Sequence, residues 1–226
     1  MNSHIELGRI AGIPIYLDLM FLAVLLFFGA RYFTSGDTQV MAMGLLILAG
    51  LLLSILLHEL GHAFAARLFG VRTREIELTG LGGVARFANS LPRSVLAKTA
   101  IYLAGPGVNL LLWLGFEQIA TSVADLGKPM AFWTFGALSI NNFWLLLFNL
   151  LPAFPLDGGR TLEAWLSAVM STAWAIRIVA ILGLVVAFGC VGLAIQGSLW
   201  MLLLAFVLYQ NNWTALQSVG GLRGGR

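Results

Sequence analysis

Long runs of apolar residues, separated by short polar segments, dominate the chain. A helix needs about 20 apolar residues to cross the hydrocarbon core of a bilayer. The runs of this length predict about six transmembrane helices, at residues 15–33, 40–69, 96–117, 131–151, 174–195 and 198–216. We expect the last two helices to meet in a tight turn around Gln196-Gly197-Ser198.

Two other segments alternate apolar with polar residues, which is the two-residue period of a β-strand. Residues 5–14 carry glycine and proline punctuation and predict a short hairpin against the membrane. Residues 72–88 predict two strands around a glycine turn at residues 80–83. An edge strand here could pair with an extended peptide, and the alternative is a plain connecting hairpin. The pattern therefore predicts an α-helical polytopic membrane protein with short membrane-associated β-strands, folded as one domain over residues 1–226.

Composition supports this interpretation and excludes some functions. Of all residues, 59% are hydrophobic and only 10% are charged, whereas soluble domains carry about 25% charged residues. The net charge of +3 is small and no nucleic-acid motif is present, so we expect no nucleic-acid partner. Cys190 is the single cysteine, which excludes an internal disulfide and predicts a small apolar packing residue. We expect neither a cleavable signal peptide nor an appended soluble domain.

The basic residues predict the orientation of the helices, because lysine and arginine concentrate in cytoplasmic loops. If the N-terminus is cytoplasmic, all but two of the 13 basic residues fall on the inner side, the exceptions being Arg31 and Lys128. We therefore expect an integral protein of the cell (inner) membrane with both termini in the cytoplasm. The end of the second helix then lies towards the cytoplasmic leaflet.

That second helix contains the sequence His58-Glu59-Leu60-Gly61-His62. Ionisable side chains are costly inside a bilayer, so their presence indicates a functional site. His58 and His62 are four residues apart and share one face of a helix, which allows two imidazoles to bind one metal ion. Glu59 projects beside them and could handle the protons of an attacking water.

A catalytic zinc site typically has three protein ligands and an open position. The candidate for the third ligand is Asp157, in the sequence Pro155-Leu156-Asp157-Gly158-Gly159. Prolines and glycines are expected to break a helix here, at its cytoplasmic end. Broken backbone at membrane depth is tolerated only where it is buried in protein or lines a wet cavity. His4, in a polar segment near the N-terminus, is a poor candidate.

Both motifs resemble those of the site-2 protease family of intramembrane zinc metalloproteases. Residues 58–62 resemble the family's zinc-binding motif, and residues 155–159 resemble its second motif. The segment Ala104 to Asn109 and the strand with Gly82-Gly83 also look like family features. The two motifs together, in order and on separate apolar segments, make the resemblance specific.

The resemblance implies roles for individual residues. His58, His62 and Asp157 would bind one Zn²⁺, and Glu59 would be the catalytic acid/base. Asn149 matches a polar family position near the site. Either Asn149 or Asn109 could donate a hydrogen bond to the developing oxyanion. The alternative for each asparagine is an ordinary hydrogen bond between helices.

The resemblance also implies a function. The protein would be an endopeptidase that hydrolyses single-pass transmembrane substrates in the bilayer near the cytoplasmic leaflet, in regulated intramembrane proteolysis, with possible substrate-presenting or regulatory partner proteins. Two other functions stay open. A divalent metal-ion transporter would need more polar residues than residues 15–33, 40–57 and 174–195 contain. A non-catalytic membrane scaffold would ordinarily have lost Glu59.

Overall fold

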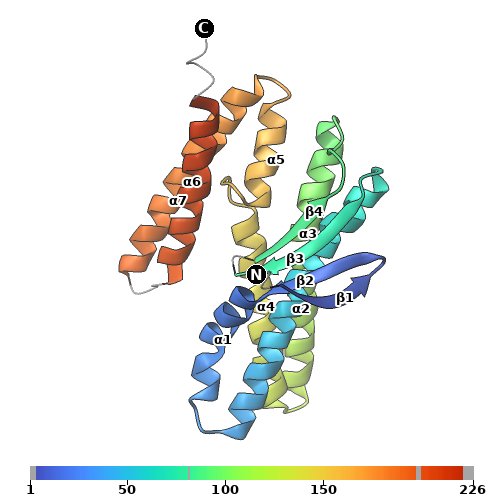
Figure 1. Ribbon diagram of the computed structural model, residues 1–226. Helices are drawn as coiled ribbons and strands as arrows, with labels where there is room; N and C mark the ends of the chain where they lie inside the picture. Colours follow the sequence, from blue (N-terminus) through green and yellow to red (C-terminus); the bar gives the residue numbers. More distant parts are fainter. Residues whose placement is uncertain (1–3, 81, 197–199, 221–226) are drawn as a thin grey trace. The chain divides into compact units, whose positions relative to one another are not determined.

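The structure, a computed structural model, describes residues 4–80, 82–196 and 200–220 (Figure 1). Its contacts divide the chain into two units. The first unit comprises Met1–Pro92 and Ala104–Leu146, and the second comprises Arg93–Leu103 and Leu147–Arg226.

A four-stranded sheet belongs to the first unit. Its strands are β1 (His4–Ile10), β2 (Ile13–Asp18), β3 (Thr73–Thr79) and β4 (Gly82–Phe87), and they lie in the order β1-β2-β3-β4. The pairs β1–β2 and β3–β4 are antiparallel, whereas β2 and β3 are parallel. Strands therefore form in both segments where the alternating pattern predicts them. Leu81, in the predicted glycine turn, lies outside the described residues.

One face of this sheet packs on a helix. Leu17 of β2 pairs with Leu78 of β3, and both side chains are buried. They share a hydrophobic cluster with Ile76, Leu60 and Ala63. Leu60 lies between the two histidines of the predicted metal site, so the sheet is fixed against the part of the helix that carries them.

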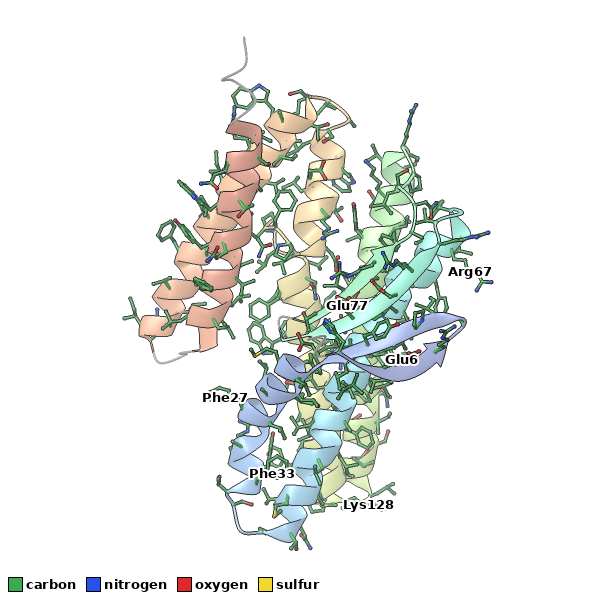
Figure 2. The ribbon with its side chains drawn as sticks, viewed as in Figure 1. Glu6, Phe27, Phe33, Arg67, Glu77 and Lys128 are labelled. Carbon is green, nitrogen blue, oxygen red and sulfur yellow. The ribbon has the colours of Figure 1, made fainter. Side chains whose placement is uncertain are left out.

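Charged residues occupy strands of the same sheet. Figure 2 labels Glu6 on β1 and Glu77 on β3. The Arg86 guanidinium lies 2.6 Å from Glu77 and 3.7 Å from Glu75. The hydrogen bond that Arg86 donates to the Glu77 carboxylate raises the pKa of Arg86. Charged side chains are costly in hydrocarbon, and the Arg86 side chain is 55% exposed, so we expect this part of the sheet to lie in contact with water.

The first predicted helix begins later than expected. Residues 15–33 predict one helix, but Ile15 to Asp18 belong to β2, and α1 spans Leu19–Phe33. The apolar run hides a strand, because Ile15 and Leu17 face the core and pair with β3. Asp18 ends the strand and caps the helix, since its carboxylate accepts a hydrogen bond from the backbone N–H of Met20 at 3.0 Å.

The other helices of the chain are α2 (Thr38–Leu68), α3 (Val95–Asp125), α4 (Pro129–Asn149), α5 (Asp157–Leu166), α6 (Thr172–Ile195) and α7 (Trp200–Gly220). Helices α1 and α2 pack side by side (Figure 1). The side chain of Phe27, on α1, points outward (Figure 2) and is 74% exposed. This exposure is expected of a side chain that contacts lipid.

In the second unit, α6 and α7 pack against each other (Figure 1). Small residues form much of their common core, which includes Ala187, Cys190, Ala194 and Ala205. Small side chains let two membrane helices approach closely. Cys190 is buried in this cluster, in agreement with its predicted packing role.

Within the described residues, four helices are long and apolar enough to cross a membrane: Thr38–Leu68, Val95–Asp125, Pro129–Asn149 and Thr172–Ile195. They coincide with four of the six predicted spans, so the chain is a mostly helical integral membrane protein with a small sheet. The first predicted span is shortened to the 15 residues of α1. The last one corresponds to α7, and the predicted turn at Gly197-Ser198 lies outside the described residues.

The second motif region also differs from its prediction. The helix does break, but only over residues 150–156, and Asp157, Gly158 and Gly159 form the first turn of α5. A Cβ on Gly158 would collide with the carbonyl of Leu150, and one on Gly159 would lie 2.5 Å from the carbonyl oxygen of Ala153. The two glycines therefore let α5 fold back onto the loop rather than end the helix.

A packing prediction follows for Gly61, between the two histidines. A Cβ there would lie 2.9 Å from the carbonyl oxygen of Ala104 and from Cγ2 of Val108 on α3. We expect Gly61→Ala to destabilise the fold by about 1–3 kcal/mol through overpacking. The matched control is Gly115→Ala on α3, where a Cβ would meet nothing within 4 Å. Thermal unfolding in detergent should separate the two variants, and equal melting temperatures would contradict the close α2–α3 contact.

Candidate metal centre

The two imidazoles of α2 face each other at close range. Nε2 of His58 lies 3.1 Å from Nε2 of His62, and the ring centroids are 4.7 Å apart at an interplanar angle of 82°. Both residues are buried, at 6% and 7% exposure. Two nitrogens that bind one tetrahedral zinc ion at its usual bond length lie about 3.3 Å apart. The helical spacing of four residues therefore produces a separation that suits a shared metal ion.

Gly105 of α3 leaves space in front of these nitrogens. A Cβ at this position would lie 2.6 Å from Nε2 of His58 and would collide with Nε2 of His62. Any larger residue would occupy the space that a ligand common to both nitrogens needs. The two ring nitrogens and the glycine opposite them therefore fit a bound metal ion.

A buried hydrogen-bond network binds Nδ1, the other ring nitrogen of His58. Nδ1 of His58 lies 2.5 Å from Oδ1 of Asn109 on α3. Nδ2 of Asn109 donates to Oδ1 of Asn142 on α4 at 2.9 Å, and Nδ2 of Asn142 donates to Oγ of Ser54 at 3.0 Å. Oγ of Ser54 in turn donates to the carbonyl oxygen of Gly50 at 2.8 Å. The network thus begins and ends on α2 and joins it to α3 and α4.

This network determines which nitrogen of His58 carries the proton. An amide oxygen can only accept a hydrogen bond, so Nδ1 of His58 must be the donor to Asn109. Nε2 is then left with its lone pair directed towards His62, as metal binding requires. A partner of this kind on the second nitrogen typically orients a metal-binding histidine and raises its affinity.

The geometry also bears on the two asparagines considered as oxyanion donors. Asn109 is fully buried, and its amide bonds both His58 and Asn142, so it joins helices and orients an imidazole. Asn142 and Ser54 were missed by the sequence reasoning. A polar residue inside an apolar helix is itself a signal, and Ser54 lies one helical turn before His58.

Glu59 lies against the sheet, beside β4. It is 6% exposed, and a Cβ on Gly83 of β4 would lie 2.5 Å from its Oε1. Gly83 therefore provides the room for the carboxylate. Because β4 is an edge strand in the described sheet, the Glu59 carboxylate adjoins a strand edge on which another extended segment could pair.

Asp157 and Asn149 belong to the second unit. Asp157 is the first residue of α5, and Asn149 is the last residue of α4. Both are partly buried. His4 is exposed at the start of β1.

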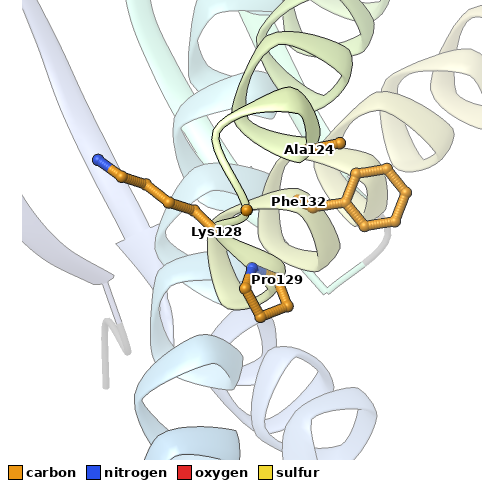
Figure 3. Close-up of a pocket in the computed structure, with 5 residues that line it drawn as sticks. Ala124, Lys128, Pro129 and Phe132 are labelled. Atoms are coloured by element: carbon orange, nitrogen blue, oxygen red, sulfur yellow. The ribbon is translucent and has the colours of Figure 1, made fainter.

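A small pocket lies at the turn between α3 and α4 and is unrelated to this site. Ala124, Gly127, Lys128, Pro129 and Phe132 line it (Figure 3), and its volume is about 240 Å³. Ala124 follows Asn109 by four turns of α3, or about 22 Å along the helix axis. The pocket is therefore too far away to contribute to the histidine pair.

The comparisons with known proteins agree with this geometry. Residues 46–124 and 114–193 match the model of peptidase family M50, and these ranges contain both histidines, Glu59 and Asp157. The chain belongs to peptidase family M50. A zinc metalloprotease of Methanocaldococcus jannaschii is 35% identical over 170 residues, which are 74% of this chain and 47% of that protein. A relative from Synechocystis sp. is 30% identical in an alignment 234 positions long, which covers 93% of this chain and 59% of that one.

One solved structure is similar to this chain along nearly its whole length. The site-2 protease from Methanocaldococcus jannaschii matches with a TM-score of 0.70 and 26% identity, over 94% of this chain and 95% of that one. The resemblance to the site-2 protease family is thereby confirmed. The chain spans about half the length of the two relatives matched by sequence.

The role of Asn109 in orienting His58 gives a prediction. We expect Asn109→Ala to weaken Zn²⁺ affinity by about 10–100-fold, because the imidazole loses the partner that fixes its proton. Asn109→Asp keeps an oxygen acceptor for Nδ1 and should lose less. Competition with a chromophoric chelator measures both affinities. Equal affinities for Asn109→Ala and the unmodified protein would show that the hydrogen bond does not support metal binding.

Proposed function

We propose that this M50 protein is an intramembrane zinc-dependent endopeptidase. His58, His62 and Asp157 hold one Zn²⁺, and Glu59 moves the protons of the reaction. The observation that carries the proposal is the buried pair of imidazoles, with their Nε2 atoms 3.1 Å apart opposite a glycine. Two imidazoles and one carboxylate form a donor set typical of catalytic zinc, with a fourth position left open. The names of relatives as zinc metalloproteases support the same assignment.

A bound zinc ion would supply a Lewis acid that polarises the scissile carbonyl and acidifies water. The chain's own residues do the rest. Glu59 accepts a proton from the attacking water and passes it to the leaving amine nitrogen. Its burial beside Gly83 restricts where the carboxylate can point. Asn109 keeps the Nε2 lone pair of His58 available throughout.

The substrates we propose are single-pass transmembrane proteins, cleaved near the cytoplasmic leaflet in regulated intramembrane proteolysis. A helical peptide bond is hydrogen-bonded and shielded, so the substrate must unwind before hydrolysis. Pairing with the edge of β4 would replace the lost backbone hydrogen bonds. Because Glu59 lies against Gly83 of that strand, the paired segment would lie beside the proton-transfer group. We assign Asn149 the donation of a hydrogen bond to the oxyanion.

We also propose that the two units act as one protease domain, because the histidines lie in the first unit and Asp157 in the second. In this proposal α1 and α7 complete a set of six membrane helices. Both termini face the cytoplasm, as the distribution of basic residues indicates, and the membrane is the cell (inner) membrane. Substrate-presenting or regulatory partners would act on this core.

The acid/base role of Glu59 can be tested with Glu59→Gln in the purified full chain. The amide keeps the shape of the side chain but cannot take up the proton, so we expect cleavage to fall by about 100–10,000-fold. Zinc content should be unchanged, since Glu59 is not a proposed ligand. The measurement is cleavage of single-pass membrane proteins in proteoliposomes, with substrates found as proteins that accumulate uncut in membranes containing the variant.

Two controls accompany this measurement. Removal of the metal with a chelator should abolish cleavage by the unmodified protein, and added Zn²⁺ should restore it. Metal-ion flux into the same vesicles should be absent in both forms. Undiminished cleavage by Glu59→Gln would refute the assigned role, and zinc-dependent flux that Glu59→Gln leaves intact would favour a transporter.

A further inference from the structure

Asn212 of α7 makes an unusual set of contacts within the second unit. It is 0% exposed, and its amide holds both backbone groups of one residue, Phe154. Nδ2 of Asn212 donates to the carbonyl oxygen of Phe154 at 2.8 Å, and Oδ1 accepts from the N–H of Phe154 at 3.0 Å. Nδ2 also donates to the carbonyl oxygen of Leu208, in its own helix, at 2.7 Å. Both amide atoms of Asn212 are thus hydrogen-bonded, and two of the three bonds go to Phe154, a residue 58 positions away.

Phe154 lies in the loop that leads to Asp157. The loop has little regular hydrogen bonding available, because Pro152 and Pro155 lack a backbone N–H. Buried backbone groups need partners, and for Phe154 the side chain of Asn212 takes the place of a neighbouring strand. The backbone at the centre of the loop is therefore fixed from α7.

Backbone contacts connect Phe154 to the start of α5. The N–H of Leu156 donates to the carbonyl oxygen of Ala153 at 2.9 Å, which closes a turn with Phe154 and Pro155 at its centre. Asp157 follows directly. Gly159 packs on the backbone of Ala153 without an intervening side chain. A displacement of Phe154 would therefore move the first turn of α5, and the Asp157 carboxylate with it.

The helix facing Asn212 is shaped to receive the amide. A Cβ on Gly183 of α6 would collide with Oδ1 of Asn212. An asparagine buried between apolar helices is unfavourable unless it is fully paired, and here the pairing is with the loop. Residue 212 also lies beyond the residues that match the M50 family, so the family match assigns it no role.

We propose that Asn212 is a positioning residue for the metal-binding carboxylate. It fixes Phe154, and through the turn at residues 153–156 it fixes the direction in which Asp157 leaves the loop. The inference rests on the proposed function, in which Asp157 is the third ligand. Asn212 contacts neither the metal ion nor the substrate and acts only through the backbone of residues 153–156.

The test uses the purified full chain in detergent, with Co²⁺ and Zn²⁺ as the probes. Asn212→Leu keeps the approximate size of the side chain and removes its hydrogen bonds. We expect metal affinity to fall by about 10–100-fold, as for other groups that orient a ligand. The visible absorption spectrum of bound Co²⁺ should also change, because it reports the number and geometry of ligands. A general loss of stability alone would not alter the spectrum of the folded, loaded protein.

The neighbouring residue provides a matched control. Nδ2 of Asn211 donates to the carbonyl oxygen of Val207 in its own helix at 2.9 Å. Asn211→Leu therefore removes an asparagine from the same helix and leaves the two hydrogen bonds between Asn212 and Phe154 in place. We expect it to bind Co²⁺ as the unmodified protein does. Asn212→Asp keeps the acceptor for the Phe154 N–H but loses the donor to its carbonyl, and its affinity should lie between the two leucine variants.

A second variant keeps the test decisive if Asn212→Leu fails to fold. Gly183→Ala displaces the Asn212 amide without removing a polar group, and we expect the same direction of change in affinity and spectrum. Its control is Gly189→Ala in the same helix, where a Cβ would meet nothing within 4 Å. Co²⁺ affinity and spectrum equal to those of Gly189→Ala would contradict the positioning role.

Asp157→Asn separates the failure of this inference from the failure of the proposed function. If Asp157→Asn binds Zn²⁺ as tightly as the unmodified protein, the third-ligand assignment is wrong and the positioning role falls with it. If Asp157→Asn binds weakly but Asn212→Leu matches Asn211→Leu in affinity and spectrum, only the role of Asn212 is contradicted.

Discussion

An imidazole buried in a membrane helix is stable only when each ring nitrogen has a hydrogen-bond partner or a metal ion. In the first unit the surroundings of His58 meet this requirement. Nδ1 of His58 is bound by Asn109, which leaves Nε2 facing His62 and the open space at Gly105. Asn109 is itself satisfied by Asn142, and Asn142 by Ser54. A single polar requirement on α2 thus accounts for polar residues on α3 and α4 that would otherwise be costly in hydrocarbon.

Both units pair a buried asparagine with glycines at the points where room is needed. In the first unit, Asn109 orients an imidazole, and Gly105 and Gly83 leave space at the histidines and at Glu59. In the second unit, Asn212 holds the loop before Asp157, and Gly183 makes room for its amide. In a membrane protein such glycines allow polar groups to approach closely without exposing them to lipid.

Sequence reasoning reached those features that depend on local periodicity. The spacing of His58 and His62 determines that they share a helix face, and alternation in residues 72–88 predicts the two strands that form there. It failed where tertiary pairing overrides an apolar run. Ile15 and Leu17 are as apolar as the helix that follows, but they pair with β3, and nothing in their own sequence reveals that partner.

The sequence also does not predict the hydrogen-bond partners of the polar residues inside the helices. Asn142 follows Asn141, and Asn212 follows Asn211, inside otherwise apolar helices. Periodicity does not show which asparagine of each pair is buried or which distant group it will bond. Asn142 bonds Asn109 and Ser54, 33 and 88 positions away, and Asn212 bonds Phe154, 58 positions away. The two glycines after Asp157 predict a helix break, because glycine is a poor helix former. In the structure their close contacts with the loop backbone favour them inside α5.

If the buried pair of imidazoles holds a catalytic metal ion, the metal content of the purified full chain shows it most directly. Elemental analysis should find one zinc ion per chain in the unmodified protein and none in the double variant His58→Ala/His62→Ala. A preparation that cleaves substrate without stoichiometric metal, or a double variant that retains its zinc, would contradict the account.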